Sequence, residues 1–377
     1  VHAVLRVEPT GGEKTAFRVE CVCMPKCTAG ERVQARFALE VPARTQQLSS
    51  YADGIALSGE YLAGMKHLGP SESFRAKTAR LQRRLSAALR KGMAQGPAGV
   101  LAAMVLGDRT HLSKDLRSAY RAAGLSHVLV VSGMHVSILC GSVFAKYLPE
   151  KKKRERGYAS RRRQALFSAA MALLLAGVTG LTPSVLRAAT AVWVSALGVW
   201  LYGPPDALTS LGVAGVWMTL GNSYAVCDIG FELSFAAVLG TLAGAELARK
   251  SRRFPLLRNG VWETLCVSAC ASAATFPVLV LRGLSASLYA LVSSVAVLWL
   301  VEPILRLGLA TALLGCWPAL APLHRVCSLC AATLAGCLNR WALWVSGWPG
   351  AQIYFDTACA ALVCLLLLGL GWLAYHW

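Results

Sequence analysis

The sequence predicts a polytopic α-helical membrane protein with a small N-terminal β domain on the extracytoplasmic side. Of the 377 residues, 55% are hydrophobic and only 15% are charged, whereas soluble domains carry about 25% charged residues. After residue 97 the chain contains about nine apolar stretches, each of roughly 17–25 residues and long enough to cross ~30 Å of hydrocarbon as a helix. Residues 1–68 instead alternate apolar and polar side chains, as half-buried strands do.

The β region, residues 1–68, follows from this period of two. Apolar side chains recur at every second position in residues 17–23 and 33–39, and a shorter strand is expected around Ile55–Leu62. Turn residues separate the runs, among them Pro25 and Gly30. The pattern predicts a small β-barrel or part of one, whose N-terminal edge is either complete or truncated.

Thirteen cysteines do not form an obvious framework. Most lie in apolar helical stretches, where cysteine packs as a small hydrophobic residue. Cys21, Cys23 and Cys27 lie in the β region, without the CxxC pairs or added histidines of a zinc site. We expect either one disulfide within this trio or free cysteines, and no metal or other cofactor.

Residues 69–96 change to a helical period. Leu81, Leu85, Ala88 and Leu89 fall on one face. The opposite face is basic, and residues 75–91 contain no acidic residue. Such a helix is expected to lie in the membrane interface. It acts either as a strut on lipid headgroups or as a basic approach for a polyanion. The approach would consist of Arg75, Lys77, Arg80, Arg83 and Arg84.

Residues 97–377 form the predicted transmembrane domain. Loop 146–163 carries nine basic residues and loop 249–258 carries five, so both are expected in the cytoplasm. The preceding span, 125–148, then enters from outside, because the number of spans between the two loops is even. This places residues 1–68 outside the cytoplasm. The spans between the loops are 164–181, 183–202, 206–221 and 231–248. The candidates after residue 260 are 261–281, 285–305, 307–323, 326–346 and 353–375.

The span 125–148 carries polar groups that are costly in hydrocarbon. On a continuous helix, His127, Ser132 and His135 fall within an arc of about 140°, so they face either the bundle interior or a wet path. Alternatively, the histidines bond to neighbouring backbone and Gly133 allows close helix packing.

Arg187 follows a helix start at Thr182-Pro183, where proline suits the first helical position. By the predicted topology this arginine lies near the outer side, where the positive-inside rule does not favour it. It is therefore expected to face an anion or an intramembrane carboxylate such as Glu232. Snorkelling to the outer headgroups is the alternative.

The segment 227–238 begins another span. Asp228 is expected to cap that helix. Phe231 and Phe235 share a face and serve either as packing residues or as a platform for bases, with Ser234 beside them. Farther on, Glu302 and Arg306 are expected to neutralise one another around Pro303, without chemistry.

Common hydrolase motifs are missing from the sequence. It contains neither the GxxxxGK[ST] of a P-loop nor HExxH, and its seven histidines are scattered. We therefore predict that the chain is not an enzyme. Two other classes stay open. One is a transporter of small molecules or lipid precursors, with Arg187 binding a carboxylate or phosphate. The other is an intramembrane serine hydrolase using Ser132 with His127 or His135.

Four stretches in residues 107–240 resemble the competence domain of the ComEC family, in the family's order: GDRTHLS, GLSHVLVVSGMHVSIL, TGLTPSVLRAA and DIGFELSFAAVLG. A weaker likeness continues through residues 274–297. Ser293-Ser294 departs from the family, which usually shows an asparagine there. Members often add N-terminal membrane helices and a C-terminal metallo-β-lactamase-like domain. We therefore expect either a fragment or a short member whose nuclease is a separate protein.

The resemblance implies an OB-like domain over residues 1–68 and a channel that passes single-stranded DNA through the bacterial inner membrane during natural transformation. Implied partners are single-stranded DNA, the lipid bilayer, a separate nuclease, a DNA receptor and a cytoplasmic ATPase. Together, the patterns and the resemblance assign these residues to the DNA path: Asp108, Arg109, His127, Ser132, Gly133, His135, Pro183, Arg187, Phe231, Ser234 and Phe235.

Overall fold

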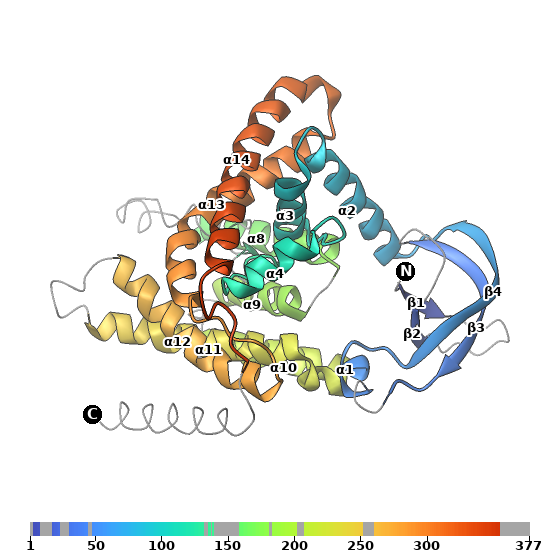
Figure 1. Cartoon of the computed structure of the whole chain (residues 1–377), viewed down its shortest axis with the longest axis horizontal. Coiled ribbons are helices and arrows are strands. Elements are labelled where there is room, and N and C mark those ends of the chain that lie inside the picture. Colours follow the sequence, from blue (N-terminus) through green and yellow to red (C-terminus); the bar gives the residue numbers. More distant parts are fainter. Residues whose placement is uncertain are drawn as a thin grey trace.

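The chain folds into a mostly helical structure with a small N-terminal sheet, which confirms the predicted class at this level (Figure 1). The structure is a computed structural model. It describes residues 3–7, 17–22, 30–43, 47–131, 135–136, 138, 158–180, 183–201, 207–251 and 260–354. In Figure 1 the sheet lies at one side of the molecule, and helix α2 leads from it into the helices.

The sheet has four strands in the order β1-β2-β4-β3. Its strands are β1 (Ala3–Val7), β2 (Phe17–Val22), β3 (Glu31–Glu40) and β4 (Leu57–Pro70). β2 pairs parallel with β4, and the other two pairs are antiparallel. Val19 and Cys21 are fully buried at the centre of a small core. β4 extends well beyond the predicted Ile55–Leu62. Gly64 and Gly69 adopt positive φ angles within it, and the β3–β4 pairing passes through register shifts.

Helix α1 (Gln47–Ala52) joins the sheet to the helical part. It packs on a short 3₁₀ helix, η1 (Ser223–Cys227), which lies just before α11. The Asn222 Nδ2 donates to the carbonyl oxygens of Tyr51 at 2.7 Å and Ala52 at 2.9 Å. These carbonyls end α1, where helix carbonyls lack partners within the helix, and that of Tyr51 also accepts the Gly54 amide at 2.9 Å. The Tyr51 and Tyr224 rings also contact each other, with centroids 5.4 Å apart.

Helix α2 (Phe74–Arg90) is the basic amphipathic helix that the sequence predicts. Its apolar face is used differently from the expectation. Leu85 and Leu89 are buried in the main hydrophobic cluster, against α3 and α13, whereas Leu81 is 40% exposed. Packing on neighbouring helices gives this face the burial that a lipid surface was expected to give.

Helix α3 (Gln95–Leu106) packs on α2, and helix α4 (Lys114–Ala122) packs on α14. Every residue of α3 from Ala98 to Leu106 is buried. The Tyr120 hydroxyl donates to Asn339 Oδ1 at 2.8 Å, and this buried bond ties α4 to α14.

The predicted helix over 125–148 is wrong at its start. Gly124 ends α4 with a φ of 73°, and residues 125–131 form turns and bends. Residues 135, 136 and 138 are helical, while the rest of this range lies outside the described residues. His127 and His135 therefore do not share the face of one continuous helix.

The four spans predicted between the basic loops correspond to α8 (Tyr158–Val178), α9 (Pro183–Trp200), α10 (Ala207–Gly221) and α11 (Ile229–Ser251). They are followed by α12 (Gly260–Leu281), α13 (Ala290–Leu314), η3 (Pro318–Leu320) and α14 (Ala321–Ser346).

The separate spans 285–305 and 307–323 are wrong, because α13 continues through this boundary with Pro303 inside it. The ion pair between Glu302 and Arg306, at 2.6 Å, bridges the turn around that proline as expected. The predicted span 353–375 lies outside the described residues from 355 onward.

The described chain is that of a multi-pass membrane protein. Within it, four helical segments are long and apolar enough to cross a membrane: Ile229–Ser251, Trp262–Leu281, Ala290–Leu314 and Pro318–Ser346. Three shorter apolar helices accompany them: Gln95–Leu106, Ser184–Trp200 and Ala207–Gly221. The count of about nine spans stays a prediction.

Glycines bring α11 and α12 into close contact. A Cβ atom on Gly240 would lie 2.5 Å from the Cys270 carbonyl oxygen, and one on Gly244 would lie 2.6 Å from that of Cys266. Such spacing by small residues lets backbones approach in membrane helices, where lipid supplies no hydrophobic drive for association.

This packing predicts that Gly244→Ala destabilises the protein. The added methyl must push two backbones apart, a change that typically costs ~1–3 kcal/mol. We expect a melting temperature several degrees lower in detergent. Gly336→Ala is the matched control, because a Cβ there meets no atom within 4 Å. Equal melting temperatures for the two variants would show that the α11–α12 contact is looser than described.

Candidate functional site

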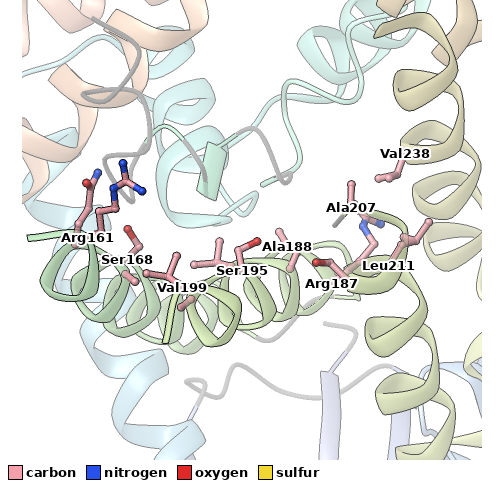
Figure 2. Close-up of a pocket in the computed structure, with 15 residues that line it drawn as sticks. Arg161, Ser168, Arg187, Ala188, Ser195, Val199, Ala207, Leu211 and Val238 are labelled. Carbon is pink, nitrogen blue, oxygen red and sulfur yellow. The ribbon is translucent and has the colours of Figure 1, made fainter. Parts of the chain in front are cut away.

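A groove of about 550 Å³ lies between α8, α9, α10 and α11 (Figure 2). Two arginines and several hydroxyl groups line it amid small apolar side chains. Helix α8 contributes Arg161 and Ser168 to the lining, α9 contributes Arg187, Ala191 and Ser195, and α10 contributes Ser210.

Helix α9 forms the long wall of this groove. Arg187, Ala188, Ala191, Ser195 and Val199 recur at helical spacing, so they share one face. From Arg187 to Val199 this face runs about 18 Å, at ~1.5 Å per residue. Alanine and serine fill little of the space in front of it. Figure 2 shows the two arginines at opposite ends of the row.

Arg187 is the buried charge of the groove. Its residue surface is only 8% exposed, although it lies on an apolar helix. The guanidinium carbon lies 6.0 Å from the centre of the Phe235 ring, at the limit of a cation–π contact. Within the described residues no carboxylate forms a salt bridge with Arg187. The groove therefore offers a positive charge to an anion.

The expectation that Glu232 might neutralise Arg187 is wrong. Glu232 forms a bidentate salt bridge with Arg282, the residue that directly follows α12, and one of its two contacts measures 3.0 Å. Arg282 also donates to the Cys227 carbonyl oxygen at 3.3 Å. The first turn of α11 lies beside the end of α12, so Arg282 lies nearer to Glu232 than Arg187 does.

The first turns of α11 position the Phe235 ring near Arg187. Asp228 Oδ2 accepts the Phe231 amide at 2.9 Å, which confirms the predicted cap. Phe231 is buried and stacks on Phe235, with ring centroids 4.1 Å apart and planes 17° from parallel. The two rings thus pack on each other, and the role of this pair as a platform for bases stays a prediction. Ser234 is half-buried on the same helix.

Asp108 holds α2 in place. Its Oδ2 accepts the Ser86 hydroxyl at 2.5 Å, and its Oδ1 accepts the hydroxyl and the amide of Thr110 at 2.5 and 3.1 Å. Next to it, Gln82 Nε2 donates to the Leu106 carbonyl oxygen at 2.6 Å. Burial alone would raise the pKa of Asp108, but these hydrogen bonds outweigh it and hold the pKa below its usual value. Asp108 does not line the groove; it positions the basic helix.

The other residues assigned to a path from the sequence are scattered. Arg109 is exposed beside Asp108. His127 is exposed in a turn, and its Nδ1 lies 3.1 Å from the Gly124 carbonyl oxygen, to which it can donate. His135 is fully buried. Pro183 begins α9. Ser132 and Gly133 lie outside the described residues.

The residues predicted to form a basic approach lie along α2. Lys77, Arg83 and Arg84 are exposed, and Arg80 donates to the Ser71 carbonyl oxygen at 2.9 Å. Arg75 belongs to the same helix. The charged face expected from the sequence is therefore present, although the helix packs against the bundle.

Sequence reasoning missed several groove residues. Arg161 counted only as part of a basic loop, although it begins the groove wall on α8. Ser168, Ser195 and Ser210 were overlooked inside apolar stretches. Their signal was available, because isolated polar residues in a membrane helix tend to face the protein interior.

A multi-pass helical membrane protein with an arginine-bearing groove between its helices is the class that fold and site define. A profile of the Competence protein family matches residues 104–377, and the chain belongs to that family. The resemblance to ComEC is thereby confirmed. The chain is similar to ComE operon protein 3 of Bacillus subtilis (strain 168), with 23% identity over 218 residues. The match covers 58% of this chain and 26% of the relative, so the chain spans about a quarter of that protein's length. No solved structure matches.

The Asp108 contacts predict a pH-dependent stability. Hydrogen bonds to a charged group contribute ~1.5–3 kcal/mol, so Asp108→Asn should lower the melting temperature at neutral pH. Because the folded pKa lies below the unfolded value of about 3.9, this contribution is fully present above about pH 4. It is lost as the pH falls through the folded pKa.

The measurement is the melting temperature of both proteins between about pH 7 and pH 3. The difference between them should narrow below about pH 4. Glu40→Gln, at an exposed carboxylate, is the control and should change little. A gap that stays constant over this range would mean that the Asp108 charge does not hold α2.

Proposed function

We propose that this chain is the membrane channel part of a DNA-uptake protein, which passes a single DNA strand into the cytoplasm during natural transformation. The observation that carries the proposal is the groove along α9, with Arg187 buried at one end and Arg161 at the other. Membership of the competence protein family agrees with it.

A DNA strand brings one negative charge per nucleotide, and it must exchange water for other partners to cross hydrocarbon. Two guanidinium groups at opposite ends of a groove whose α9 wall runs about 18 Å can contact different phosphates of one strand, while serine hydroxyls of the lining can donate hydrogen bonds. The wall between is made of alanine, serine and valine. Such a wall has no pair of side chains suited to reading a base edge, which suits transport independent of sequence.

The remaining parts fit around this path. We take residues 1–68 as an OB-like domain on the extracytoplasmic face of the bacterial inner membrane, with the basic face of α2 as the approach. Lys77, Arg83 and Arg84 would attract the strand, and Asp108 would keep their helix in position. The role is passage without catalysis. A separate nuclease, a DNA receptor and an ATPase that supplies energy complete the proposal.

A transporter of small anions is the second candidate. A groove of about 550 Å³ is within the range of pockets that hold small ligands, ~300–1,000 Å³. The same Arg187 would then bind one carboxylate or phosphate. The two functions differ in whether Arg161, at the far end, is needed together with Arg187.

The proposal predicts that Arg187→Gln abolishes DNA uptake at normal protein abundance, because the guanidinium is reserved for phosphate and holds no carboxylate. Arg187→Lys keeps the charge and should retain partial uptake, since a lysine cannot form the same planar contacts. Arg161→Gln should lower uptake several-fold. Transformation frequency and immunoblots of membrane fractions are the measurements.

Arg163→Gln is the matched control for Arg161→Gln, since Arg163 is exposed on α8, the helix that carries Arg161, and does not line the groove. Normal uptake in Arg187→Gln would overturn the channel role. Loss of uptake of a small anion, with transformation unchanged, would favour the transporter.

A further inference from the structure

A second pocket, of about 500 Å³, lies between α4 and the end of α14, away from the groove. Asp115, Ser118 and Ala119 line it from α4, and Ser346, Trp348 and Gln352 line it from the other side. We propose that this pocket binds the headgroup of a phospholipid that carries an ammonium group, such as phosphatidylethanolamine.

The walls of this pocket are held by several independent contacts. The buried Tyr120–Asn339 hydrogen bond joins α4 to α14. The Tyr289 hydroxyl donates to the Pro349 carbonyl oxygen at 2.8 Å, and Ala286 pairs with Ile353 in an isolated bridge. The segment after α14 is thus fastened to the start of α13, and the pocket has fixed sides.

Aromatic rings place the pocket at a membrane surface. α14, which is apolar enough to cross a membrane, ends at Ser346, and its rings form a chain. Trp341 contacts Trp344, Trp344 contacts Trp348, and Trp348 contacts Tyr289, with centroids 4.7–5.4 Å apart. Tryptophan and tyrosine gather at the level of lipid headgroups. Trp344, 58% exposed, is available to lipid.

Charge selects the headgroup. Among the described residues that line the pocket, Asp115 alone is charged. It is exposed, and no salt bridge joins its carboxylate to another described residue, in a chain with twice as many basic as acidic side chains. An ammonium group would pair with this carboxylate and lie near the Trp348 ring. Ser118 and Gln352 offer hydrogen-bond donors to the adjoining phosphate, whereas the Ser346 hydroxyl already donates to the Leu343 carbonyl oxygen at 2.7 Å.

The same charge disfavours an anionic headgroup without an amine. Phosphatidylglycerol would bring its phosphate toward Asp115, and none of the described lining residues is basic to offset the repulsion. The Asp115 carboxylate would therefore favour phosphatidylethanolamine over phosphatidylglycerol. It does not depend on the DNA path, because no residue is shared between the pocket and the groove.

The test uses the full chain, purified in mild detergent from cells whose membranes hold both phosphatidylethanolamine and phosphatidylglycerol. Mass spectrometry of the retained lipid should show enrichment of phosphatidylethanolamine over its share of the membrane. Asp115→Asn should reduce this enrichment about three- to fivefold, the effect of one exposed ion pair. Lys114→Gln, next to it and outside the pocket lining, is the control and should retain the lipid.

Further arms keep the proposal falsifiable. Asp115→Glu preserves the charge and should preserve the enrichment, and melting temperatures verify that each variant is folded. Unchanged enrichment in a folded Asp115→Asn protein would overturn the proposal. Soluble O-phosphoethanolamine, added without lipid, is the last arm. If it raises the melting temperature as much as phosphatidylethanolamine does, the pocket binds a free amine and the lipid proposal is overturned.

Discussion

The arrangement depends on the cost of holding the Arg187 guanidinium inside an apolar bundle. An arginine at the centre of a membrane helix costs ~2.5–3.5 kcal/mol on insertion scales, and less near the interface. The structure offsets part of this with the Phe235 ring, which is itself stacked on Phe231. We infer that the remaining cost is offset by an anion that enters the groove, because Glu232 already forms a salt bridge with Arg282. Within the described residues this charge has no carboxylate partner, which is why we propose that it binds a ligand.

The neighbouring elements are fastened so that this charge stays accessible. Asn222 anchors α1 to the turn before α11, and Asp228 caps the helix that carries Phe231 and Phe235. On another side, the Asp108 carboxylate accepts a hydrogen bond from Ser86 on α2, a helix that also packs on α8 of the groove wall. These contacts are polar and lie at helix ends, while the helix interiors pack through small residues such as Gly240 and Gly244.

Local patterns in the sequence predict much of the fold and less of the site. Helices between the basic loops follow from hydropathy, and β2 and β3 follow from alternation, because each depends on near neighbours in the chain. The split at residue 306 was wrong because Pro303 is tolerated inside α13, beside the Glu302–Arg306 pair. The partner of Glu232 could not be foreseen, since pairing across 50 residues is set by how α11 packs on α12. Arg187 was identifiable from the sequence, because a charged side chain within an apolar helix has a high free-energy cost of membrane insertion. The serines facing it were not identified, because a serine in a helix carries a weak signal until its neighbours are known.

The most direct test of the groove is to ask whether DNA touches it during uptake. A small diazirine amino acid placed at Ser195, midway along α9, should cross-link to a radiolabelled strand when uptake is stalled and the sample is irradiated. The same group at Leu220, 80% exposed on α10 and outside the groove, should give little product. Cross-linking at Ser195 that disappears with Arg187→Gln is the predicted result. Equal cross-linking at both positions, or none at Ser195 while transformation proceeds, would contradict a DNA path along α9.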